Sequence, residues 1–323
     1  MTSPRSQLID PALPGYFHCV SRCVRRAFLC GSDSISGKDF EHRKSWVEDR
    51  LLALAECFAV GIYAYAVMSN HLHVVVHVDP DAAAGWSAEE VAQRWVRLFP
   101  VREHGEVDVE ACRLRAEVLA GDPTRIAELR ARLASISWFM RCLSEPIARR
   151  ANREDNCTGR FWEGRFKCQA LLDDAAVLAC MAYVDLNPIR AGMAPSLAAS
   201  DHTSIKNRLI GLQTDDANVA LEPVAGPASS GLPLNLGEYL ELADWTGRIL
   251  RSDKRGAIEA AAPPILRRLG LRESEWSCQV KGIESHYWRA VGAVEALMEK
   301  AKALGQCWMK GGGAVRRLRP AMA

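Results

Sequence analysis

The sequence predicts an α+β fold in which an antiparallel sheet carries helices on one face. Residues 15–23 alternate apolar and polar side chains, which is the period of a β-strand. Residues 40–58 repeat apolar side chains at three- and four-residue steps, which is the period of a helix. Two β-rich runs, 59–68 and 71–78, flank a short polar break and therefore predict two antiparallel strands.

Two further helices are expected in the middle of the chain, over residues 87–99 and 126–143. The sequence Asp122-Pro123-Thr124 is a favourable start for the second one, because it supplies a capping side chain and a proline in the first turn. Pro146 is expected to end or kink this helix, because proline lacks a backbone N–H.

The next part of the chain predicts a loop that leads into a strand, over residues 160–172, followed by a helix. Asp173 can cap this helix. The helix should run to about Leu186 and stop near Asn187, because Pro188 disfavours helical backbone at the residue before it.

Composition limits the possible functions. The chain has 41 Lys and Arg against 39 Asp and Glu, a net charge of +2, so binding of a polyanion requires local clustering of charge. The longest run without charged or strongly polar side chains, residues 57–68, is shorter than the ~20 residues that span a bilayer. We therefore expect a soluble, cytoplasmic protein without a membrane partner.

The eleven cysteines are scattered and form no Cys-x-x-Cys pair. Disulfide scaffolds are short and rich in cysteine, and zinc sites show closely spaced ligand pairs. Neither pattern is present, so we expect most of these thiols to fill the core in a reducing compartment.

His71 and His73 are the first candidate site residues. They lie two apart in a predicted strand, so both imidazoles project from one face and can share a divalent ion. Imidazole suits Mn²⁺, Zn²⁺ or Ni²⁺ better than Mg²⁺, although oxygen ligands from elsewhere can complete an octahedral site. The alternative is that two histidines share a half-exposed strand face by chance. His77, on the same face, is either a third ligand or a solvated residue at the strand end.

Tyr183 and Asn187 are four residues apart and therefore neighbours on one face of the predicted helix. The flanking side chains on that face, Ala176, Ala179 and Cys180, are small. This leaves a shallow surface from which a phenol can point toward a substrate. The alternative is that the small residues let the helix pack closely on a sheet, with the tyrosine filling a gap.

Four separated blocks of the sequence occur in the order that is typical of one family. They are YFHCVSR, AYAVMSNHLHVVVHV, RFWEGRFKCQALL and YVDLNPIRAGM, within residues 14–200. In these blocks the chain resembles the HUH-type Y1 tyrosine transposases, in the IS200-like or REP-associated tyrosine transposase branch. Four blocks in register are more specific than any one of them alone.

This resemblance implies a ferredoxin-like sheet with packed helices, which is the HUH nuclease fold, and a chemistry. His71, His73 and Asn187 would bind a divalent ion, Mg²⁺ or Mn²⁺. Tyr183 would attack a phosphorus of single-stranded or hairpin DNA and form a 5′-phosphotyrosine link, which a 3′-hydroxyl later resolves. The implied role is DNA transposition or processing of repeated hairpin elements, by a monomer or a homodimer.

The resemblance also divides the chain, and a prior of about two domains for 323 residues agrees with it. Residues 1–200 are expected to form the transposase-like domain, with an insertion at about 79–134. Residues 201–323 form an extension, with a proline- and glycine-rich linker at about 221–237, then a helical region and a basic tail.

Basic residues that alternate with aromatic ones suit single-stranded or hairpin DNA, through phosphate contacts and base stacking. The alternative is a mixed-charge surface loop. The candidate DNA-binding residues are Arg22, Arg25, Arg26, Arg149, Arg150, Arg153, Arg160, Trp162, Arg165 and Lys167. Two other functions remain open: a sequence-specific DNA-binding regulator that has lost catalysis, and a rolling-circle initiator or relaxase with the same chemistry.

Overall fold

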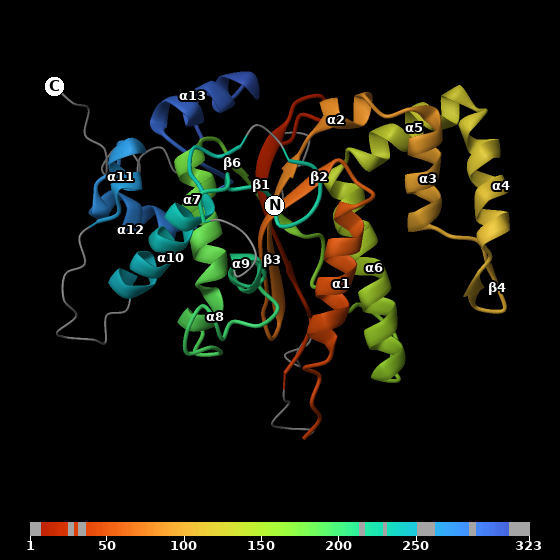
Figure 1. The fold of residues 1–323 in the computed structure, drawn as a ribbon, viewed down its shortest axis with the longest axis horizontal. Helices are drawn as coiled ribbons and strands as arrows, with labels where there is room; N and C mark the ends of the chain where they lie inside the picture. Colours follow the sequence, from red (N-terminus) through yellow and green to blue (C-terminus); the bar gives the residue numbers. More distant parts are fainter. Residues whose placement is uncertain are drawn as a thin grey trace.

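The computed structural model describes residues 8–24, 29–31, 37–212, 217–228, 231–250, 262–283 and 289–309 (Figure 1). Its centre is a five-stranded sheet with the strand order β2-β3-β1-β6-β7. Neighbouring strands are antiparallel, except for β6 and β7, which are parallel. The strands are β1 (Gly15–Arg22), β2 (Val60–Val67), β3 (His71–Val78), β6 (Lys167–Leu171) and β7 (Ala290–Val291).

Helices cover both faces of this sheet, whereas one covered face was expected. The helices α1 (Arg43–Ala55) and α6 (Ile136–Glu154) connect strands and share one core with Phe17, Val74 and Val76. The helix α7 (Asp174–Asp185) packs on β2 and β3 from the opposite side (Figure 1). The reason is visible in the strands: β2 is buried along its whole length, as expected for a strand with apolar neighbours on both faces.

The expected helix over residues 126–143 is divided into two. The helix α5 (Pro123–Leu133) begins at the Asp122 cap as predicted, and α6 begins after Ser135, whose hydroxyl accepts from the amide of Trp138 at 3.5 Å. Pro146 does not end α6, which continues to Glu154. The buried guanidinium of Arg43 pairs with Glu154 and Asp155, and this contact holds the end of α6 against α1.

The expected insertion forms a helical layer at one side of the molecule (Figure 1). It contains α2 (Pro80–Ala84), α3 (Ala88–Leu98), β4 (Arg102–Glu103), β5 (Glu106–Val107), α4 (Val109–Ala120) and α5. A capping box between Ser87 and Glu90 starts α3. The helix α4 has no buried residue and packs on α3 at the edge of the layer.

The later part of the chain packs around α7 and along the sheet. It contains α8 (Asn187–Arg190), α9 (Ser204–Leu212), α10 (Leu236–Leu250), α11 (Pro264–Arg268), α12 (Glu273–Gly282) and α13 (Val294–Ala303). The helices α10 and α12 lie against α7, and β7 extends the sheet beside β6. Within the expected linker, Val224 and Ala225 hydrogen-bond to Ile62 in β2, at 2.7 and 2.8 Å. The division of the chain near residue 200 stays a prediction.

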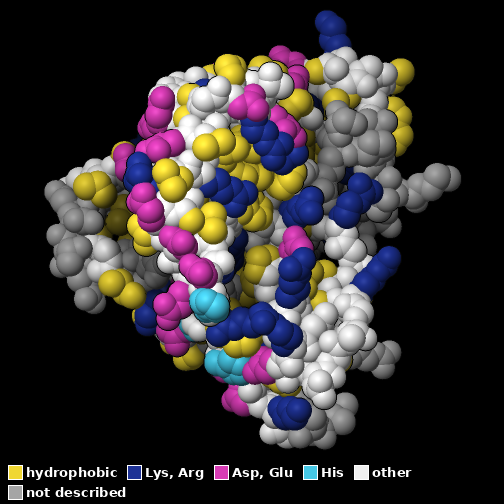
Figure 2. Space-filling model, turned by 90° about the vertical axis from the view of Figure 1, so that its right-hand side faces the viewer, with side chains coloured by type: hydrophobic (Ala, Val, Ile, Leu, Met, Phe, Trp, Pro, Cys, Tyr) yellow, Lys and Arg dark blue, Asp and Glu magenta, His cyan; other side chains and the backbone are white. Residues whose placement is uncertain are grey.

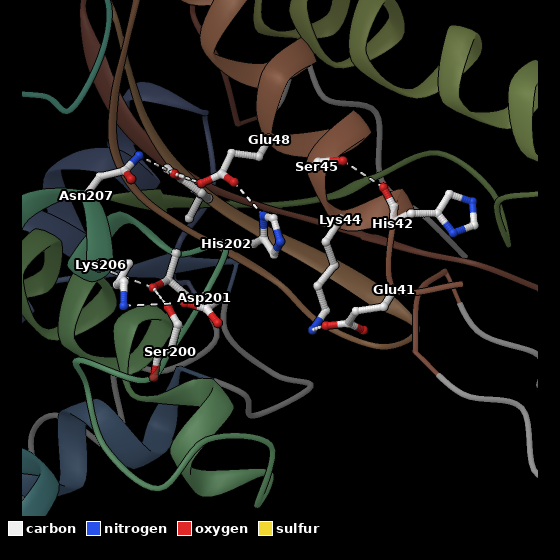
Figure 3. A network of polar contacts seen from close by, with 12 residues as sticks. Glu41, His42, Lys44, Ser45, Glu48, Ser200, Asp201, His202, Lys206 and Asn207 are labelled. Carbon is white, nitrogen blue, oxygen red and sulfur yellow. Dashed lines mark hydrogen bonds and ion pairs between the residues drawn. The ribbon is translucent and has the colours of Figure 1, made fainter. Parts of the chain in front are cut away.

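A polar network joins α1, β2 and α9 (Figure 3). Glu48 accepts a hydrogen bond from the Tyr65 hydroxyl at 2.5 Å and lies 2.5 Å from Nδ1 of His202. The amide of Asn207 donates to the same Tyr65 hydroxyl at 2.6 Å. Both carboxylate oxygens of Glu48 and the Tyr65 hydroxyl thus have partners, as their burial requires.

Two expectations from composition can be compared with the structure. Among the described residues, no helix is both long and apolar enough to cross a membrane. None of the eleven cysteines, all of which lie in the described residues, forms a disulfide. The six that are buried confirm the expectation of core filling for those positions: Cys19, Cys23, Cys30, Cys57, Cys142 and Cys180.

Candidate functional site

The strand register brings three histidines to one face of the sheet. In the pairing of β1 with β3, Arg22 lies opposite His71 and Val20 lies opposite His73. Directly opposite residues share a face, and every second residue of a strand returns to it, so His18 also projects on this side. The helix α7 packs on the same face, which places the predicted histidine pair and the predicted tyrosine in one layer.

The distances show that this layer is compact. The ring centroids of His71 and His73 are 4.7 Å apart, and those of His73 and Tyr183 are 5.6 Å apart. Asn187 begins α8, directly after α7, and its amide donates to the Tyr183 hydroxyl at 3.4 Å. The structure thus brings all four residues together, while their roles as ligands and nucleophile stay predictions.

Of the two alternatives for Tyr183, the structure agrees with close packing of the helix on the sheet, and the phenol does not point out from a shallow surface. Its side chain has 0% exposure, because nearly every residue of α7 is buried between the sheet and the helices α10 and α12. Its ring belongs to the apolar cluster around α7, and its centroid lies 5.6 Å from that of His73 and 6.1 Å from that of His18. The guanidinium of Arg190, an exposed residue, lies 5.0 Å from the centroid of the tyrosine ring.

His18 and Gln169 belong to the same layer, and the sequence reasoning did not identify them. Nε2 of His18 is 2.9 Å from Nδ1 of His73, and the two rings are nearly parallel. Nδ1 of His18 is 2.8 Å from Oε1 of Gln169, whose Nε2 donates to the backbone carbonyl of Ile283 at 3.1 Å. The available signal was the strand period, which sets His18 on the face of the histidine pair once the pairing register is known.

Burial keeps the two inner imidazoles neutral. It lowers the pKa of His18 to about 4, against the opposing effect of the Gln169 bond. Burial also lowers the pKa of His73 well below its ordinary value, and the neighbouring His18, His71, Arg22 and Arg190 act in the same direction. A neutral imidazole has a lone pair on one nitrogen, which is the form that binds a metal ion.

The imidazoles of His73 and His71 are the nitrogen donors that this layer could offer to a divalent cation. Nε2 of His73 is buried, and within the part of the chain that the structure describes it has no hydrogen-bond partner. Nδ1 of His71 is 2.5 Å from the side-chain oxygen of Asn70, which can only accept, so Nδ1 carries a proton, and the neutral form of this ring has its lone pair on Nε2. No group of three or more His, Cys, Asp or Glu side chains among the described residues could hold a metal, so further ligands would be the Asn187 amide oxygen, water or phosphate.

His77 is neither a solvated end residue nor part of the pair. Its side chain is 6% exposed, and its ring lies 4.5 Å from that of Tyr16. Four residues of strand separate it from His73 by about 13 Å. The reason for its burial is that Tyr16 covers this end of the sheet face.

Several of the candidate DNA-binding residues lie at or near the end of β1 that faces His71 of β3. Arg22 is exposed and lies opposite His71, and its backbone carbonyl accepts from the amide of Glu163 at 2.9 Å. The segment 160–167 therefore borders the same end of the sheet, and the side chains of Arg160, Arg165 and Lys167 are exposed there. Arg22 is thus the neighbour of His71 across the β1–β3 pair, and Lys167 pairs with Val20, which lies opposite His73.

The other candidates have structural partners or lie elsewhere. Arg150 stacks on Trp46 of α1 at 3.7 Å, and the indole N–H of Trp162 donates to the Ser144 carbonyl at 2.8 Å. Arg149 and Arg153 line a shallow hollow at the end of α6. Figure 2 shows Lys and Arg side chains through the middle of the face that carries α3 to α6, with Asp and Glu side chains beside them. Arg25, Arg26 and the basic tail from Lys310 onward lie outside the described residues.

Comparison with known proteins gives one finding. No protein-family model matches the chain, and no curated protein matches it. Among solved structures, a REP-associated tyrosine transposase bound to a REP hairpin aligns with 71% of this chain and 93% of its own, at 11% identity and a TM-score of 0.34. Identity and TM-score at these levels assign neither a fold family nor a function to the chain.

Proposed function

We propose that this protein cleaves and rejoins single-stranded or hairpin DNA through a covalent phosphotyrosine link, in transposition or in processing of repeated hairpin elements. One observation carries the proposal: the Tyr183 ring lies 5.6 Å from that of His73, whose buried Nε2 has no hydrogen-bond partner among the described residues. A strand and a helix more than 100 residues apart in the chain supply these groups. The β1-α1-β2-β3-α6-β6 order of the core is the connectivity of the ferredoxin-like fold that the sequence motifs imply.

The chemistry follows from the phenol. Oη of Tyr183 attacks the phosphorus in line and the bond from phosphorus to the 3′-oxygen breaks. The phenol loses its proton to water, and the leaving 3′-oxygen takes up a proton from water, so the step is balanced. The products are a 5′-phosphotyrosine and a free 3′-hydroxyl, which can reverse the step or act on another strand. The covalent link preserves the energy of the phosphodiester, so rejoining needs no nucleotide cofactor.

A phenol with a pKa near ~10 is a weak nucleophile at neutral pH and needs assistance. His71 and His73 would hold a divalent ion, Mg²⁺ or Mn²⁺, with the amide oxygen of Asn187 as a third protein ligand. Bound there, the ion supplies positive charge to the phosphoryl oxygens and eases loss of the phenolic proton. Arg190 contributes a second positive charge beside the ring, 5.0 Å from its centroid.

The exposed cations around Arg22 provide the route for the DNA backbone. Arg22 lies opposite His71, and Arg160, Arg165 and Lys167 follow on the adjoining segment. Phosphate contacts of this kind make binding depend on salt concentration. Because Tyr183 has no exposed surface, the proposal also requires a rearrangement that opens the layer when DNA binds.

The proposal is tested by incubating the purified full chain with end-labelled hairpin DNA and Mn²⁺. An adduct that resists SDS is expected for the wild-type protein and is expected to be absent in Tyr183→Phe. Tyr16→Phe is the matched control, because this half-buried tyrosine lies on the same sheet face but packs against Tyr63 and His77. An adduct that persists in Tyr183→Phe would refute the proposed nucleophile.

A DNA-binding regulator without catalysis is the second candidate, and the complete burial of Tyr183 favours it. The same experiment separates the two. Hairpin binding in a gel-shift assay without any adduct, over a range of Mn²⁺ and Mg²⁺ concentrations, supports the regulator. Nicked-origin substrates would distinguish a rolling-circle initiator from a transposase, because both use the same chemistry.

A further inference from the structure

We infer that His18 is a positioning residue that fixes the tautomer of His73 and so directs the lone pair of His73 Nε2 toward the metal position. The inference rests on the proposed function for the identity of that position. Its structural basis is a hydrogen-bonded chain of four groups: the Ile283 carbonyl, the Gln169 amide, and the His18 and His73 imidazoles.

The donor and acceptor roles in this series of hydrogen bonds are determined at its Ile283 end. The backbone carbonyl of Ile283 can only accept, so the atom of Gln169 that lies 3.1 Å from it is the NH₂ group. The amide oxygen of Gln169 consequently faces His18, at 2.8 Å from Nδ1. Because this oxygen can only accept, Nδ1 of His18 carries the proton.

The tautomer of His18 then determines the tautomer of His73. A neutral His18 with its proton on Nδ1 has a lone pair on Nε2, which is 2.9 Å from Nδ1 of His73. That contact is a hydrogen bond only when Nδ1 of His73 carries the proton. The lone pair of His73 is therefore on Nε2, the same buried atom that has no partner among the described residues.

The alternative proton arrangement fails at two contacts. If Nε2 of His73 carried the proton, two lone pairs would face each other across the 2.9 Å between the rings. Turning His18 to its other tautomer would relieve that contact but would set a lone pair of His18 against the Gln169 oxygen. Both rings are at least 96% buried, so water does not readily compensate either contact.

Outer partners of metal-binding histidines fix ring orientation and tautomer, and their loss commonly lowers metal affinity roughly 10- to 100-fold. His18→Phe keeps a ring of similar shape beside His73 but removes the acceptor. We expect Mn²⁺ to bind this variant roughly 10- to 100-fold more weakly. His18→Gln offers an amide oxygen to the same N–H and is expected to keep most of the affinity.

The experiment combines calorimetric titration of the full chain with Mn²⁺ and ¹⁵N NMR of its histidines without metal. The titration compares wild type, His18→Phe, His18→Gln and the control His77→Phe, which removes an imidazole from the same strand face outside the chain of hydrogen bonds. Wild-type affinity is expected for His77→Phe. In the NMR spectrum the wild-type His73 is expected to carry its proton on Nδ1, and His18→Phe is expected to lose this preference.

The outcomes separate the inference from the proposed function. A proton on Nε2 of His73 in the metal-free wild type overturns the inference, whether or not any variant folds. Unchanged Mn²⁺ affinity in a folded His18→Phe overturns it as well. Absence of a DNA adduct from the wild type counts against the proposed function alone, because the NMR measurement needs neither metal nor DNA.

Discussion

The carboxyl group of Asp185 offers a stability test of the helix that carries Tyr183. Asp185 is fully buried and accepts hydrogen bonds from the Ser204 hydroxyl at 2.5 Å and the Ile205 amide at 3.1 Å. The Tyr239 hydroxyl donates to its other oxygen. The carboxylate therefore joins α7 to α9 and α10. Replacing it by Asp185→Asn retains an accepting oxygen but removes the charge.

Burial raises the pKa of Asp185 from 3.8 to about 6, against the opposing hydrogen bonds from Ser204 and Tyr239. The folded protein thus holds this proton more tightly than the unfolded chain. The contribution of the protonated Asp185 to the free energy of unfolding is complete below about pH 4 and is lost as the pH rises toward 6. At about 1.4 kcal/mol per pKa unit, the loss between these limits is about 3 kcal/mol. The asparagine variant does not titrate and escapes this loss.

Urea unfolding followed by circular dichroism, from pH 3.5 to 7.5, measures the effect as a difference between the two proteins. The difference in unfolding free energy should move in favour of Asp185→Asn by about 3 kcal/mol across this range, because all other titrating groups are common to both. Parallel pH profiles for the two proteins would refute the reasoning, since they would show that Asp185 has the same pKa in the folded and unfolded states.

Two further substitutions test the packing around β2. In Gly61→Ala the new Cβ would lie 2.6 Å from the Pro227 carbonyl oxygen. The free energy of unfolding, measured by heat or urea, is expected to fall by about 1–3 kcal/mol. The control Gly164→Ala has open space around the new Cβ and should unfold as the wild type. Tyr65→Phe removes the hydroxyl that donates to Glu48, and should cost about 1–2 kcal/mol in the same assay; an unchanged midpoint would show that the network in Figure 3 does not contribute to stability.

The strands and most helices could be predicted from the sequence because their signals are local. The alternation in residues 15–23 and the Asp173 cap correspond to β1 and α7. The break between α5 and α6 was missed, because Ser135 is a single capping residue inside an otherwise continuous apolar pattern. Packing of α7 on the second sheet face depends on how the strands pair, and spacing in the sequence does not contain that information.

The candidate site, too, could be predicted from the sequence only in part. That His71 and His73 share a face follows from the period of a strand, and that Tyr183 and Asn187 are neighbours follows from the period of a helix. The nearness of the two pairs came only from the family resemblance. His18 could not be identified, because its contact with His73 depends on the register between β1 and β3. The burial of Tyr183 depends on helices that follow it in the chain.

The outer edge of β2, the first strand of the sheet, is covered by later parts of the same chain, and this has a consequence for self-association. Ile62 exchanges both of its backbone hydrogen bonds with Val224 and Ala225, and the amide of Tyr65 donates to the Ser204 hydroxyl at 2.8 Å. An unprotected outer strand is a template on which a second molecule can add its own strand and begin an aggregate. Here these backbone groups already have partners, so a second molecule could add a strand at Ile62 and Tyr65 only by displacing residues 224–225 and the Ser204 hydroxyl.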